Sequence, residues 1–226
     1  MKKLLIVAAT SFEIAPLFNF LTESFETKEG TYHKNGLEVQ VLIAGVGMVN
    51  MTYSMTGLLT SGQSYDLAIN AGLGGAFDLN SNLGDVVNIV KDTFADIGVI
   101  EQDDNFVSVF DLQFIDANEL PYTNGWIENR DGNSDFLPNR SAVTVNSVSG
   151  SGSGIMRLKA AYSADVESME GAAFAFVCSK FDQRYLQLRA ISNYIEPRNR
   201  SNWKVELALD NLNKVLISMI EALLSD

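Results

Sequence analysis

Four residues with chemically capable side chains follow predicted strands or open helices in this sequence. Glu13 comes just after an apolar run, Glu170 opens a helix, and Asn193 ends an apolar strand that also contains Arg189. For either carboxylate alone, stabilisation by the dipole at a helix start is an ordinary explanation. Their common place at one end of a sheet indicates a site of acid–base and hydrogen-bonding chemistry. A buried arginine such as Arg189 normally requires a carboxylate partner.

The composition excludes several other chemistries. The 226 residues include one histidine, His33, and one cysteine, Cys178, which excludes a His-rich metal site and a disulfide framework, so we expect no metal. With 28 Asp and Glu against 16 Lys and Arg, the net charge is −12, which argues against nucleic acid and acidic membranes as partners. A hydrophobic content of 46% is typical of a globular chain and excludes disorder.

Two glycine clusters follow predicted strands. Residues 45–50 partly match a dinucleotide-binding fingerprint, but Asn50 replaces the third glycine and no acidic residue ends the next strand. The cluster Gly72-Leu73-Gly74-Gly75 lacks the Lys-Ser/Thr pair of a P-loop, which argues against nucleoside triphosphates. A tight turn or bulge and a close approach to a ligand both explain such clusters.

The order of the predicted elements is typical of an α/β fold. Strands are expected over residues 4–10, 66–71, 142–148 and 185–191, with one or two more in 84–100 and a hairpin at 32–44. Helices are expected over residues 13–21, 45–59, 155–161, 169–180 and 203–224. This alternation predicts a mostly parallel sheet covered on both faces, in a single domain of residues 1–226. Ligands in such sheets bind beyond the carboxyl ends of the strands.

Residues 101–140 form the least regular segment, and we expect a long loop over one end of the sheet. Its aromatic residues Phe110, Phe114 and Tyr122 could cover a substrate or pack at a subunit interface.

The N-terminal segment imitates the start of a signal peptide, because two lysines precede the apolar residues 4–9. Glu13 interrupts the apolar run, so a buried strand is the better interpretation. No segment approaches the roughly 20 apolar residues that span a bilayer. We expect a cytoplasmic protein, in agreement with its single free thiol.

Several motifs together resemble the nucleoside phosphorylase/nucleosidase superfamily over most of the chain. They lie at residues 8–13, 45–47 and 70–75, and in the paired segments 166–173 (VESMEGAA) and 188–193 (LRAISN). Within this superfamily, the extra Ser168 and the tail at 192–203 are similar to futalosine hydrolases of the alternative menaquinone pathway. The resemblance implies a three-layer α/β/α fold around a central mixed, mostly parallel twisted sheet. It also implies a homo-oligomer that binds a small nucleoside without a metal or organic cofactor.

The resemblance implies roles that suit the residue types. Breaking an N-glycosidic bond leaves positive charge on the ribose and electrons on the purine, so an enzyme must bind the sugar, activate water and donate to the purine. By resemblance, Glu170 binds the ribose hydroxyls, Met169 packs on the sugar, and Glu13 is the general base. Arg189 would orient the water or balance the carboxylates. The other residues expected near the substrate are Gly72 and, against the purine along residues 145–150, Val145, Asn146 and Val148.

Asn193 departs from the adenine-releasing members of the superfamily, which carry Asp there to protonate adenine N7. An amide cannot deliver a proton, but its NH₂ group can donate a hydrogen bond to O6 or N7. Hypoxanthine presents acceptors at both atoms, whereas adenine presents an amino group at position 6. Asn193 therefore favours a hypoxanthine nucleoside such as futalosine.

Glu13 favours water over phosphate as the attacking group, because a carboxylate repels a phosphate dianion and can deprotonate water. The benzoate of futalosine calls for a cation; Arg198 and Arg200 are candidates, or they are ordinary surface arginines. The alternatives are a methylthioadenosine/adenosylhomocysteine nucleosidase, a purine nucleoside phosphorylase, and a nucleoside-binding protein without catalysis.

Overall fold

The computed structural model describes residues 2–78, 81–102 and 105–225. Its first strand is β1 (Lys2–Ala8), which is buried from residue 4 onward and pairs in parallel with β4 (Leu37–Ile43) and β5 (Leu67–Ala76). The predicted hairpin is confirmed, because β3 (Thr31–Lys34) and β4 are joined by Asn35 and Gly36, both at positive φ.

The strands form a mixed sheet, as expected. Its order is β2 (Glu26–Lys28), β3, β4, β1, β5, β12 (Val166–Ser168), β11 (Asn139–Thr144), β6 (Val86–Phe94), β10 (Trp126–Glu128) and β9 (Tyr122–Thr123). Strand β13 (Tyr185–Tyr194) pairs in parallel with β5 and antiparallel with β6, so β5, β13, β6, β11 and β12 close a ring. Strands β7 (Gly98–Ile100) and β8 (Phe106–Ser108) form a separate hairpin.

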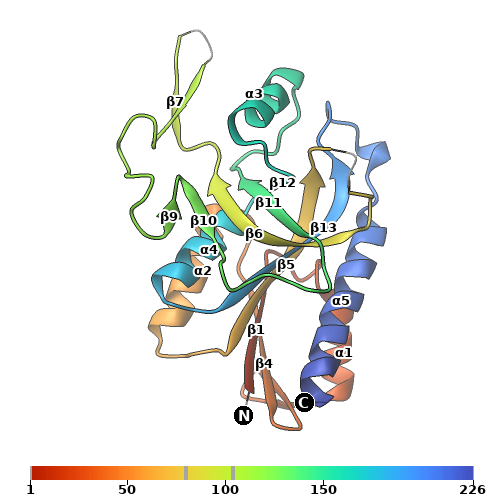
Figure 1. Cartoon of the computed structure of the whole chain (residues 1–226). Helices are drawn as coiled ribbons and strands as arrows, with labels where there is room; N and C mark the ends of the chain where they lie inside the picture. The colour runs from red at the N-terminus through yellow and green to blue at the C-terminus, as the bar shows by residue number, and fades with distance from the viewer. Residues whose placement is uncertain (1, 79–80, 103–104, 226) are drawn as a thin grey trace.

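Helices cover both faces of the sheet (Figure 1). Alternate residues of β1 enter two cores. Leu4 and Ile6 pack with α1 (Ala15–Ser24) and α5 (Val205–Ser225). Leu5 and Val7 pack with α2 (Met48–Thr60) and α4 (Gly171–Lys180).

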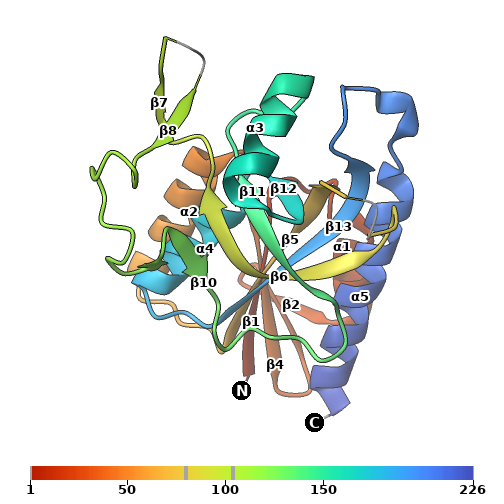
Figure 2. The same cartoon turned by 45° about the horizontal axis from the view of Figure 1, so that its top comes forward.

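Helix α3 (Gly152–Tyr162) lies beyond the end of the sheet at which β11 terminates (Figure 2). A short 3₁₀ helix at Arg200–Asn202 precedes α5. Among the described helices, none combines the length and the apolar character needed to cross a bilayer.

The structure corrects several predicted boundaries. Strand β5 continues through the glycine cluster to Ala76, so the alternative of a tight turn there is wrong. The strand predicted at 142–148 ends at Thr144, and β12 was not predicted. Both differences concern strands of the closed ring: β11 has six residues and β12 has three. Such short strands are stabilised by pairing with strands that are distant in sequence.

Residues 101–140, expected to be a loop, contain β8, β9 and β10, and residues 103–104 lie outside the described part. Strands β9 and β10 extend the sheet beside β6. The rings of Phe110 and Tyr122 pack edge to face in the core beside α4, with their centroids 5.0 Å apart. Phe114 is exposed.

Candidate active site

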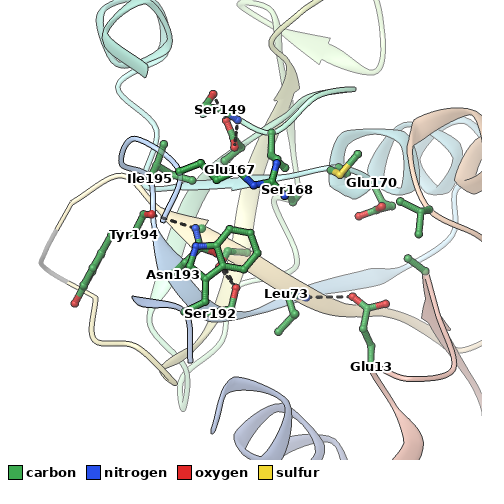
Figure 3. A pocket seen from close by; sticks show the side chains of 18 of the residues that line it. Glu13, Leu73, Ser149, Glu167, Ser168, Glu170, Ser192, Asn193, Tyr194 and Ile195 are labelled. Atoms are coloured by element: carbon green, nitrogen blue, oxygen red, sulfur yellow. Dashed lines mark hydrogen bonds between the residues drawn. The ribbon is translucent and has the colours of Figure 1, made fainter. Parts of the chain in front are cut away.

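A cavity of about 290 Å³ opens where β1, β5, β12 and β13 end (Figure 3). Its walls come from residues 9–10, 12–13, 73–75, 148–149, 167–170 and 192–196, with Val46, Arg198 and Trp203. These segments are far apart in sequence. Their meeting place is the end of the sheet at which ligands bind in parallel α/β folds.

Glu13 is held in the turn between β1 and α1. Its Oε2 accepts hydrogen bonds from the backbone N–H of Thr10 at 2.9 Å and from Thr10 Oγ1 at 3.1 Å. Its Oε1 accepts from the N–H of Leu73 at 3.4 Å. Asn213 of α5 is 1% exposed; it donates to the Glu13 carbonyl at 2.9 Å and accepts from the Leu17 N–H at 3.0 Å. These contacts fix both the backbone and the carboxylate of Glu13.

Glu170 immediately precedes α4, and its carboxylate reaches across to the start of α2. Oε1 accepts a hydrogen bond from the Gly47 N–H at 2.8 Å. Burial raises the pKa of Glu170, and the negative charge of Glu13 adds to this increase. The Gly47 hydrogen bond and the positive charge of Arg189 oppose it. The carboxylates of Glu13 and Glu170 therefore share one electrostatic environment.

Arg189 is 1% exposed and lies on β13. Its guanidinium donates to the side-chain oxygen of Asn70, to the Asn70 carbonyl at 3.5 Å and to the Leu188 carbonyl at 2.9 Å. The prediction of a direct carboxylate partner is wrong, because Arg189 forms no ion pair with any described residue. The Asn70 side chain and the carbonyls of Asn70 and Leu188 accept from its two terminal nitrogens instead.

Burial lowers the pKa of the Arg189 guanidinium, whereas the charges of Glu170, Asp92 and Glu13 raise it. Its Nε has no hydrogen-bond partner among the described residues. Arg189 does not line the cavity, so its charge acts on the carboxylates from behind the wall.

Asn193 follows a bulge at Ser192 that places it beside Gly75 of β5. Its Oδ1 accepts from Ser192 Oγ at 2.8 Å, and its Nδ2 donates to the Tyr194 carbonyl at 3.1 Å. An amide nitrogen carries two protons, so one donor remains for a ligand. Figure 3 shows Asn193 at one end of the cavity and Glu13 with Glu170 at the other.

Of the other residues predicted for the site, some line the cavity and some do not. Met169 and Val148 line the cavity. Gly72, Val145 and Asn146 do not: Val145 is buried under α3, and the Asn146 side chain and N–H bind the carboxylate of Asp96. The backbone of Gly72 packs against Glu13, since a Cβ there would lie 3.0 Å from its Oε1.

Two features of the cavity wall were not predicted from the sequence. Glu167 is buried there and binds Ser149, although its place in a motif with Glu170 was a usable signal. Trp203 stacks with Arg198, whose guanidinium carbon lies 5.7 Å from the ring centroid. Arg200 does not line the cavity. Among the described residues, no group of three or more His, Cys, Asp or Glu side chains could hold a metal ion.

The family profile of the phosphorylase superfamily matches residues 3–225. The chain therefore belongs to the phosphorylase superfamily, and its central mixed sheet between helices is the fold of that family.

Particular members of the family can be compared with this chain. A futalosine hydrolase of Streptomyces coelicolor is 30% identical over 174 residues, which cover 75% of this chain and 73% of that protein. A 5'-methylthioadenosine/S-adenosylhomocysteine nucleosidase of Maridesulfovibrio salexigens is 40% identical over 90 residues, or 38% of each chain. The structure of Helicobacter pylori futalosine hydrolase superposes with a TM-score of 0.76 at 20% identity, over 98% of both chains.

Proposed function

We propose that this protein hydrolyses the N-glycosidic bond of futalosine and releases hypoxanthine. The observation that carries this proposal is the division of the cavity. Two carboxylates, Glu13 and Glu170, occupy one end, and the amide of Asn193 occupies the other. The similarity to the Streptomyces coelicolor protein, named futalosine hydrolase, supports the choice of substrate.

In this proposal the ribose lies at the carboxylate end. Glu170 accepts hydrogen bonds from the ribose hydroxyls and stabilises the positive charge that develops on the sugar. Glu13, held by Thr10 and the Leu73 N–H, removes a proton from the attacking water. Arg189 places a positive charge behind the wall, which opposes the increase that burial causes in the pKa of Glu170.

At the other end, Asn193 donates a hydrogen bond to the departing purine. Its Oδ1 is occupied by Ser192 Oγ, so the NH₂ group faces acceptors rather than donors. O6 and N7 of hypoxanthine are both acceptors, which makes a 6-oxopurine the better leaving group.

Hydrolysis is favoured over phosphorolysis by the charge of the cavity wall. Among the described residues that line the cavity are four carboxylates, of Glu13, Glu167, Glu170 and Glu196, and a single cation, Arg198. A phosphate dianion in this environment would be repelled, whereas water would not.

The positive charge of Arg198 favours futalosine, which carries a benzoate, over nucleosides whose 5'-substituent is neutral. It is the only lysine or arginine among the described residues that line the cavity, and it pairs with no carboxylate in the described part of the chain. We assign the benzoate of futalosine to Arg198, with Trp203 against its ring. Replacing Arg198 with Gln should raise KM for futalosine about tenfold and leave inosine, which lacks the benzoate, unchanged. An equal change for both substrates would remove Arg198 from this role.

We also propose that the protein is a homo-oligomer located in the cytoplasm. An apolar groove runs along α2, where the side chains of Val49 and Tyr53 are 77% and 81% exposed. Exposed apolar surface of this kind is typical of an interface. Helix α2 follows Val46, which lines the cavity, and Gly47, which donates to Glu170, so a second copy on this groove would lie beside the active site. The single buried thiol, Cys178, suits a reducing compartment.

The test is an assay with futalosine, inosine and 5'-methylthioadenosine, each with and without phosphate, in which the released base is identified by chromatography. We expect hypoxanthine from futalosine without phosphate. Absence of base from futalosine would refute the proposal, and a strict need for phosphate would indicate a phosphorylase. The local 40% identity to a nucleosidase makes release of adenine from 5'-methylthioadenosine the second candidate activity.

A further inference from the structure

Glu167 is a buried carboxylate in the cavity wall that the chemistry above does not use. It lies on β12, is 2% exposed, and faces the cavity near Asn193 (Figure 3). Its Oε1 accepts from the Ser149 N–H at 2.9 Å and its Oε2 from Ser149 Oγ at 2.6 Å. In the described part of the chain no cation pairs with it. Burial raises its pKa, and the two Ser149 hydrogen bonds oppose that increase.

The register of the sheet places Glu167 in line with Asn193. Gly75 of β5 pairs with Asn193 on one side and with Glu167 on the other. Residues in register on neighbouring strands point to the same face, and two strand spacings amount to about 10 Å. The backbones of Glu167 and Asn193 therefore lie about 10 Å apart with their side chains on one face of the sheet, which leaves room for a purine between the two polar groups.

Gly75 lies between Glu167 and Asn193 and has no side chain of its own. A Cβ there would lie 3.1 Å from Nδ2 of Asn193 and 2.2 Å from Cδ1 of Ile195. Any side chain at position 75 would displace both neighbours. Glu167 therefore supplies an acceptor on one side and Asn193 a donor on the other. The Ile195 side chain covers the backbone of Gly75 between them.

The two groups match the hydrogen-bonding edge of a 6-oxopurine. Such a base carries an N1–H donor next to its O6 acceptor, whereas adenine carries an N1 acceptor next to an amino donor. A carboxylate has about four acceptor positions, and Ser149 occupies two of them. The remaining positions of Glu167 can accept from N1–H. Adenine in the same pose would place its N1 lone pair against the carboxylate and its amino group against the amide of Asn193.

We propose that Glu167 is a specificity-determining residue that accepts the N1–H of a 6-oxopurine while Asn193 donates to O6 or N7. Ser149 is a positioning residue that orients the Glu167 carboxylate. The inference rests on the proposed function, because the base concerned is the leaving group of the nucleoside. It identifies the part of the substrate that Glu167 recognises.

The test measures binding of free hypoxanthine and free adenine by calorimetry to the unaltered protein and to Glu167→Gln. We expect the dissociation constant for hypoxanthine to rise about tenfold to a hundredfold in the variant, with adenine unchanged or bound more tightly. An equal loss for both bases would overturn the proposal and leave Glu167 as a support for Ser149 only. Glu196→Gln is the matched control, because Glu196 also lines the cavity but binds Asn202. It should not change the ratio of the two affinities.

A second measurement compares two ligands on the same protein, so it does not depend on equal stability of the two variants. 1-Methylhypoxanthine lacks the N1–H and should bind the unaltered protein about tenfold to a hundredfold more weakly than hypoxanthine. In Glu167→Gln this difference should shrink, whereas a purely steric effect of the methyl group would persist and overturn the proposal. These measurements use the bases alone, so they are independent of the futalosine assay. Preference for hypoxanthine without futalosine turnover would refute the proposed substrate and support the role of Glu167.

Discussion

Asp92 lies at the centre of a buried network that holds the start of α4, next to Glu170. It is 1% exposed, and it accepts hydrogen bonds from Gln187 Nε2 at 2.7 Å and from Thr144 Oγ1 at 3.0 Å. Thr144 Oγ1 in turn accepts from the Ala172 N–H at 2.7 Å. Burial raises the pKa of Asp92 from its ordinary 3.8 to about 6, against the effects of these hydrogen bonds and of the Arg189 charge. We therefore expect Asp92→Asn to change how stability depends on pH.

The sign follows from the proton balance. Between pH 4 and pH 6 the folded state binds more protons at Asp92 than the unfolded state does, so the free energy of unfolding falls as the pH rises through this window. The contribution becomes constant about one pH unit above the folded-state pKa, once Asp92 is ionised in both states. The raised pKa of Asp92 therefore lowers the free energy of unfolding of the wild type by about 2 to 3 kcal/mol between pH 4 and pH 7.5. Asparagine does not titrate, so the Asp92→Asn variant does not show this loss.

The assay is urea unfolding of the wild type and of Asp92→Asn at pH 4, 5, 6 and 7.5. The variant should gain about 2 to 3 kcal/mol relative to the wild type as the pH rises across this range. Hydrogen bonds lost by the substitution are nearly the same at each pH, so they cancel from this comparison. Asp210→Asn, which removes an exposed carboxylate on α5, controls for the change in net charge. A stability difference that does not vary with pH would refute the reasoning.

Three further predictions concern the site and its supports. Glu13→Gln should lower kcat about 10²- to 10⁴-fold while hypoxanthine still binds, as measured by steady-state kinetics and calorimetry; unchanged turnover would remove Glu13 from the mechanism. Tyr53→Glu should separate the subunits, as measured by light scattering after gel filtration, and an unchanged mass would place the interface elsewhere. In Gly171→Ala the new Cβ would lie 2.1 Å from Gln187 Nε2, so urea unfolding should show a loss of about 1 to 3 kcal/mol. Wild-type stability would contradict the tight packing at Gly171.

Local patterns were sufficient to predict most of the fold. The apolar run of β1 forms a strand buried on both faces, and the spacing of apolar residues in α5 buries Leu212 and Leu216. Where patterning was weak, the prediction was incomplete. Strand β12 has three residues and β9 has two, and both depend on pairing with distant strands rather than on local propensity.

The sequence by itself determined the residue types available for chemistry and the strand ends that carry Glu13, Glu170 and Asn193. That inference succeeded because the carboxyl ends of parallel strands meet at one edge of a sheet, whatever the details of packing. The three side chains do line one cavity.

Only the tertiary structure decided which groups support these residues. Asn213 binds the Glu13 carbonyl across 200 positions, and Asn70 rather than a carboxylate binds Arg189. The alignment of Glu167 with Asn193 depends on a bulge at Ser192 and on an antiparallel pairing with β5. The two-residue period of a strand specifies which side chains share a face, but the neighbouring strands and their register are set by packing of the whole chain.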